Sequence, residues 1–270
     1  MEHEFNRVIS LTLRAQRDKV ISYLLSKESL FAQAVTGKAT LYQGLAKAGT
    51  DWEATLDELG ITFDPWLDDI TDILTRAAQS GAGAGLDRLS DYLDDLQDRA
   101  FSAMVNQVNT AAADWAREHA ARLVTEISDT TRDMLREQIS DAIERGLSVK
   151  ELASEIRDCS AFAPERAELI AVTELAEADV RGNKIAYADS GVVVGLRWVA
   201  EGGYADDAIC DACAMNSGAV VPIGPDGMAA EPYPSGARGV PAHPRCRCDE
   251  IPVLAGEDDG DEDEDKDGDA

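Results

Sequence analysis

Four cysteines and one histidine near the carboxy-terminal end are of the types that bind soft metal ions. Cys210 and Cys213 form a Cys-x-x-Cys pair, and His243-Pro-Arg-Cys246-Arg-Cys248 follows after 29 intervening residues. Zinc takes four such sulfur or nitrogen donors in a tetrahedron, and structural sites are assembled from two close pairs separated by a loop. The spacing therefore predicts a structural zinc site in which the protein fills every position and no catalytic water is bound.

Reduced free thiols and disulfides are the two alternatives for these cysteines. The first residues include two acids and are not followed by an apolar core, so we expect no secretory signal. No apolar run approaches the ~18 residues of a membrane-spanning helix. We therefore expect a cytoplasmic protein, and cytoplasmic thiols stay reduced, which makes disulfides the least favoured state. Zinc is favoured over free thiols because its binding would stabilise a module that has little core.

Other residues capable of catalysis lack the partners that catalysis requires. The chain has three histidines; His3 is near the terminus, and we predict that His119 lies on the surface of a long helix. Neither the His-x-Glu of zinc deaminases nor the His-Glu-x-x-His of zinc proteases occurs. Cys159 has no histidine near it in the sequence and is predicted to be a small buried apolar group. We therefore expect no enzymatic activity.

Helices are predicted for most of the chain. Apolar residues recur at helical spacing from Phe5 to about Ala48, which predicts two or three helices broken at Gly37 and Gly44. Asp51 is a candidate N-cap for the next helix, and Phe63–Trp66 is a turn from which a helix restarts, because proline is tolerated in a first turn.

A second helical region follows a glycine-rich stretch. Ser80–Gly85 alternates glycine with small residues and is predicted to be a flexible linker, because it lacks the Gly-Lys-Ser/Thr ending of a phosphate loop. Residues 86–146 form the longest periodic stretch, ending at Gly146. Ser148 and Glu151 form a capping box for the next helix, and Pro164 begins another that runs to about Ala188.

The carboxy-terminal part reads as short strands and loops. Val192–Val199 is rich in β-branched and aromatic residues and predicts a strand. Residues 214–242 include five glycines and five prolines, so no long helix can form there and the loop needs a clamp. The tail Glu257–Ala270 is almost wholly acidic and should be disordered. The expected fold is α+β and mostly α, in which a long-helix amino-terminal part precedes a small strand-and-loop module clamped by zinc. Its regions are 1–80, 86–190, 191–255 and the tail 256–270.

The charge of the chain limits what it can bind. Twenty-five basic residues against 52 acidic ones give a formal net charge of -27. Coating DNA requires lysine and arginine to neutralise phosphates, which this balance does not favour. Only the first fifty residues are mildly basic.

The order of these segments resembles the phage Mu F-like family of head morphogenesis proteins. The resemblance covers about residues 105–254, and its most specific part is the His-Pro-x-Cys-Arg-Cys ending. Where that family commonly has Arg-Thr-Glu, this chain has Val172-Thr173-Glu174. The segments that carry the resemblance are Thr131–Gly146, Leu147–Ala153, Arg166–Glu174, Gly191–Trp198, Cys210-x-x-Cys213 and His243–Cys248.

The resemblance implies a minor capsid protein of a tailed phage, present in the host cytoplasm during assembly and then in the procapsid or virion. It would act with portal, capsid or scaffold proteins, could associate with itself, and could assist DNA packaging or delivery. It implies no reaction. The Glu-x-Glu needed by ADP-ribosyltransferase toxins, to which some relatives are linked, occurs only at Glu2–Glu4 and Glu262–Glu264.

An alternative function is that of a zinc-containing nucleic-acid-binding or regulatory protein. In that case Arg238, Arg245 and Arg247 would contact phosphate, whereas in an assembly protein they would pair with Asp249, Glu250 or acidic helices. The net charge favours the assembly protein and predicts weak or no direct DNA binding.

Overall fold

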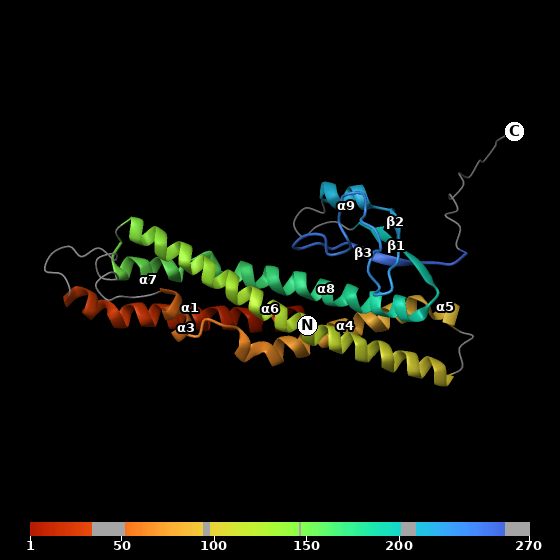
Figure 1. Ribbon diagram of the computed structural model, residues 1–270, viewed down its shortest axis with the longest axis horizontal. Helices are drawn as coiled ribbons and strands as arrows, with labels where there is room; N and C mark the ends of the chain where they lie inside the picture. The colour runs from red at the N-terminus through yellow and green to blue at the C-terminus, as the bar shows by residue number, and fades with distance from the viewer. Residues whose placement is uncertain (34–51, 94–97, 146, 201–208, 257–270) are drawn as a thin grey trace. The chain divides into compact units, whose positions relative to one another are not determined.

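We describe the fold from a computed structural model (Figure 1). The structure describes residues 1–33, 52–93, 98–145, 147–200 and 209–256. The chain forms two compact units, of which unit 1 comprises Met1–Ala77 and Ala113–Leu175, and unit 2 comprises Ala78–Ala112 and Ala176–Ala270. Their boundary falls within three helices: α4 (Leu67–Arg88), α6 (Asp98–Glu144) and α8 (Pro164–Ser190).

Unit 1 is helical in its described part. Besides its segments of α4, α6 and α8, it contains α1 (Glu2–Gln33), α3 (Trp52–Glu58), η1 (Asp64–Trp66), α7 (Val149–Arg157) and η2 (Ser160–Phe162). Phe5, Ile9 and Leu13 recur every four residues along α1 and are buried, as expected for one apolar face of an amphipathic helix. Helix α1 packs against α7.

Unit 2 contains a small antiparallel sheet next to α9 (Asp211–Asn216) (Figure 1). The strand order is β2-β1-β3, with β1 at Val193–Val199, β2 at Val220–Pro222 and β3 at Asp249–Leu254. Unit 2 also contains α5 (Ser90–Leu93). The buried Trp198 of β1 meets the Tyr233 ring edge-on, with centroids 4.8 Å apart. The protein is therefore mostly helical with a small sheet near its carboxy-terminal end, as predicted.

Several local predictions are confirmed. Ser148 Oγ accepts the Glu151 backbone N–H, and the Glu151 carboxylate accepts the Ser148 N–H, which is the reciprocal pairing of a capping box. Pro164 is the first residue of α8. The predicted strand corresponds to β1, and the short helix α9 ends at Asn216, three residues into the Gly/Pro-rich loop.

The prediction of a linker at Ser80–Gly85 is wrong, because α4 runs through it without a break. A Cβ added to Gly81 would lie 1.9 Å from the Asp179 carbonyl oxygen, and one added to Gly182 would lie 1.9 Å from that of Ala78. Glycine is therefore needed here for close contact between α4 and α8, and the helix tolerates it despite its low propensity.

Other predictions fall partly or wholly outside the described residues. Helix α1 is continuous through the described part of the first predicted helical stretch. Gly37, Gly44, Asp51 and Gly146 lie outside the description, as does the acidic tail from Glu257 onward. None of the described helices is long and apolar enough to cross a membrane.

Candidate metal centre

Two short segments of unit 2 supply the five predicted metal donors. Cys210 is the N-cap of α9, and Cys213 lies in its first turn. His243, Cys246 and Cys248 lie in the segment that leads into β3, which pairs with β1 along six registered positions. The structure brings all five predicted donors together.

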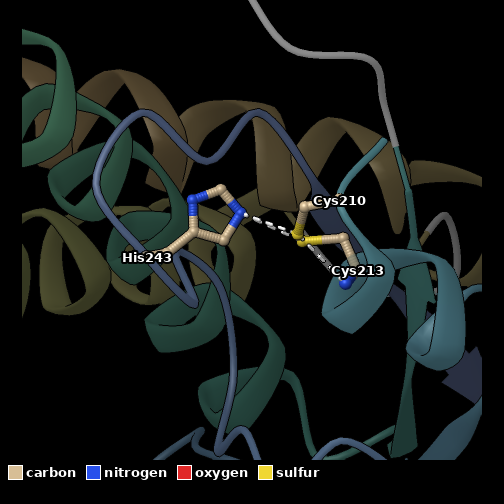
Figure 2. Close-up of side chains that lie close together, drawn as sticks. All are labelled: Cys210, Cys213 and His243. Atoms are coloured by element: carbon tan, nitrogen blue, oxygen red, sulfur yellow. Dashed lines mark hydrogen bonds between the residues drawn. The ribbon is translucent and has the colours of Figure 1, made fainter. Parts of the chain in front are cut away.

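The donor atoms form two overlapping groups of three. His243 Nε2 lies 3.3 Å from Cys210 Sγ and 3.3 Å from Cys213 Sγ, so that these three side chains point toward one another (Figure 2). Cys213 Sγ also lies 3.9 Å from Cys246 Sγ, and with Cys248 these two thiols form the second group. Within each group all donor atoms lie within 4.8 Å of one another, so the cluster can hold a metal ion.

The orientation of His243 suits a ligand. Its Nδ1 lies 2.8 Å from the backbone oxygen of Pro244. A carbonyl can only accept, so Nδ1 donates to it, and Nε2 faces the two thiols. A hydrogen bond from the outer nitrogen is the usual way in which a metal-binding imidazole is held.

The thiols have pKa values that differ with their surroundings. Burial raises the pKa of Cys213, and neighbouring thiols raise it further. Burial also raises the pKa of Cys246, against hydrogen bonds from the backbone of Ala242 and Cys248. The pKa of exposed Cys210 is instead lowered, chiefly by the hydrogen bond from the Cys213 backbone N–H at 3.4 Å. A divalent cation would favour the thiolate form throughout the cluster, since metals bind deprotonated cysteine.

A buried ion pair secures the segment that carries three of the donors. Lys184 of α8 pairs with Glu250 of β3, two residues after Cys248. The backbone N–H of Val240 donates to the same carboxylate at 3.1 Å. A Cβ on Gly239 would lie 2.7 Å from Lys184 Nζ, so only glycine lets the chain pass this close. These contacts hold the backbone on both sides of the His243–Cys248 segment.

The two acidic residues at the start of β3 have distant partners. Asp249 and Glu250, predicted as partners of Arg238, Arg245 or Arg247, pair with Arg88 at 2.7 Å and with Lys184. These two partners lie more than fifty residues away in the sequence, and no local signal indicates them.

The predicted surface position of His119 is wrong. His119 is 9% exposed, and its Nε2 lies 2.6 Å from Glu174 Oε2. The ring stacks on Trp115, with centroids 4.6 Å apart. Glu174 belongs to the Val-Thr-Glu motif singled out in the sequence, but its pairing with a residue 55 positions away has no sequence signal.

The prediction for Cys159 is also wrong in one respect. Its side chain is only half-buried, and Sγ accepts the backbone N–H of Ala161 at 3.4 Å as the N-cap of η2. Among the described residues, all five cysteines are free of disulfides.

The fold and the cluster define a mostly helical protein with a small Cys/His module that can bind a metal ion. The chain is 23% identical over 156 residues to the uncharacterized protein YqbB of Bacillus subtilis (strain 168), a match covering 57% of this chain. The chain spans about half the length of that curated relative, since the match covers 50% of YqbB. No known protein family and no solved structure matches the chain.

Proposed function

We propose that the Cys/His cluster binds one structural zinc ion. The observation that carries this proposal is the convergence of His243 Nε2 on two thiols, with a third thiol 3.9 Å from Cys213 Sγ. Sulfur atoms bound to one tetrahedral zinc at ~2.3 Å lie about 3.8 Å apart, which matches that separation. Cys210, Cys213, His243 and Cys246 would hold the ion.

Cys248 is the fifth donor of the cluster. We place it outside the proposed ligand set because its Sγ groups only with the thiols of Cys213 and Cys246, whereas contacts of 3.3 to 3.9 Å link the other four donors. The ion would contribute folding free energy to a segment rich in glycine and proline. Four protein ligands leave no open position, so the site would not be catalytic.

We further propose that the chain is a structural assembly protein of a phage head. Support comes from the resemblance of residues 105–254 to Mu F-like head morphogenesis proteins, together with a helical body that carries a small closed metal module. Its partners would be portal, capsid or scaffold proteins, and its location the host cytoplasm and then the procapsid or virion. The net charge of -27 disfavours the alternative of a nucleic-acid-binding protein.

Two measurements test these proposals separately. Elemental analysis of protein purified without chelator should find close to one zinc per chain, whereas a folded, reduced, metal-free preparation would contradict the zinc site. Mass spectrometry of procapsids and virions of the encoding phage should detect the chain at low copy number. Its absence from both kinds of particle would refute the assembly role whatever the metal content.

A further inference from the structure

Unit 1 contains a hollow of about 490 Å³ whose lining includes three arginines. Arg14 and Arg17 come from α1, and Arg157 comes from the last turn of α7. The buried ring of Phe162 and the start of α8 complete the wall. Three guanidinium groups thus gather at one concavity in a chain whose formal net charge is -27.

Two of these arginines differ from most others in the described structure. Several exposed arginines elsewhere in unit 1 pair with carboxylates, as Arg117 does with Asp114 at 2.8 Å. Within the described part of the chain, Arg14 and Arg157 have neither a hydrogen bond nor an ion pair, and Arg17 pairs only with the adjacent Asp18 at 2.9 Å. Like charges gathered at one concavity repel one another, and a bound anion would relieve that repulsion.

Arg166, which follows the lining residue Glu165 in α8, carries a further positive charge. Its guanidinium donates to the Thr131 hydroxyl at 2.9 Å and to the Ala161 carbonyl at 2.7 Å, both of which are uncharged. Burial lowers its pKa, but an arginine remains protonated at neutral pH. The amino-terminal end of the 27-residue α8, at Pro164, contributes the positive end of a helix dipole.

Two carboxylates also line the hollow, Asp158 and Glu165. Neither of them pairs with an arginine of the hollow among the described residues. With Arg166 and the helix dipole included, the positive groups outnumber them.

We propose that this hollow binds a phosphate group. Guanidinium groups present paired N–H donors that match phosphate oxygens bidentately, and such charge-assisted hydrogen bonds are stronger than neutral ones. The volume lies in the range of small-molecule sites, and Phe162 offers an apolar surface to the rest of the ligand. The phosphate could belong to a small free anion or to the backbone of a nucleic acid.

Calorimetric titration of the full-length protein with pyrophosphate at low, constant ionic strength tests the proposal. The variant Arg14→Gln/Arg157→Gln removes the two unpaired guanidinium groups. The control Arg117→Gln/Arg136→Gln removes two exposed arginines of α6 that are paired at i,i+3 spacing. Both variants change the net charge equally, and circular dichroism should show that both keep the helical fold.

We expect the wild type and the control to bind pyrophosphate with similar affinity, and the pocket variant to bind at least 100-fold more weakly, or about tenfold for each arginine. Equal affinity in all three proteins, or no binding by the wild type at millimolar pyrophosphate, would overturn the proposal. Displacement of bound pyrophosphate by a single-stranded DNA oligonucleotide would assign the phosphate to a nucleic-acid backbone. If pyrophosphate stays bound in the presence of the oligonucleotide, the phosphate group belongs to a small free anion.

Discussion

The ammonium group of Lys184 contacts the carboxylate of Glu250 where water has no access. The side chains are 2% and 0% exposed. Since a charge buried without its partner is costly, loss of either side chain would leave the other as an uncompensated buried charge.

Substitution of Lys184 by methionine should therefore destabilise unit 2 strongly. Removing one partner of a buried ion pair costs about 3–5 kcal/mol, measurable as a lower midpoint in urea denaturation. The exposed Lys150 offers a control, and Lys150→Met should change the free energy of unfolding by less than about 0.5 kcal/mol. The double variant Lys184→Met/Glu250→Gln should recover part of the loss, because no unpaired charge remains. If the double variant is less stable than Lys184→Met alone, the pair is not the source of the effect.

The effect of replacing a cysteine should depend on whether its thiol belongs to the metal cluster. Cys213 belongs to both groups of donors, so Cys213→Ser should abolish stoichiometric zinc binding and expose residues 214–242 to protease, while the helical circular dichroism signal persists. Cys159→Ser is the matched control, because that thiol lies outside the cluster. Loss of zinc from the control as well would show that thiol loss anywhere disturbs the fold.

Cys246 and Cys248 provide a sharper comparison. We expect Cys246→Ser to lower zinc affinity by at least tenfold, since it removes a ligand, and Cys248→Ser to leave the stoichiometry at one zinc per chain. Competition with a chromogenic chelator gives both affinities. If Cys248→Ser lowered the zinc affinity and Cys246→Ser did not, Cys248 would be the ligand in place of Cys246.

Tyr187 should make the stability of unit 2 sensitive to alkaline pH. Burial is the main cause that raises its pKa to about 12, against a hydrogen bond from Arg88 that lowers it. The folded state therefore favours the neutral phenol more than the unfolded state does, whose pKa is about 10. The resulting stabilisation, about 3 kcal/mol, is complete below pH 10 and is lost as the pH rises toward 12.

Tyr187→Phe isolates this contribution. The free energy of unfolding of the wild type should fall more steeply between pH 9.5 and 11.5 than that of the variant, as followed by urea denaturation at each pH. Parallel curves would mean that the phenol ionises equally in the folded and unfolded states.

Two neighbouring glycines of α4 should respond in opposite directions to alanine. A Cβ at Gly81 would lie 1.9 Å from the Asp179 carbonyl oxygen, so Gly81→Ala should cost about 1–3 kcal/mol or more. Gly83 has no atom within 4 Å of its added Cβ, so Gly83→Ala should be neutral or stabilise by up to about 1 kcal/mol through helix propensity. Thermal melts of the two variants make the comparison. Similar losses in both would contradict the close contact at Gly81.

The sequence predicts those features whose causes are local. The capping box at Ser148 and Glu151 involves residues three apart, and β1 is indicated by its own β-branched composition. The donors of the metal cluster are likewise recognisable by type and spacing. The sequence does not show that these donors form two groups sharing Cys213, because that arrangement depends on how β3 pairs with β1.

The features that the sequence misses have distant causes. The stretch Ser80–Gly85 has the composition of a linker, and only the passage of α8 at Asp179 explains why glycine occurs inside a helix. His119 shows no pattern that distinguishes a buried from an exposed position, since its partner Glu174 lies on another helix.

The Sγ atom of Cys210 both caps α9 and faces His243. Helix initiation and ion capture therefore share one atom. A thiolate accepts a backbone N–H more strongly than a thiol does, so an ion that keeps Cys210 deprotonated would also nucleate the first turn of α9. The amide of Cys213, which donates to that sulfur, would then report on metal loading, and its hydrogen exchange should slow when the ion binds.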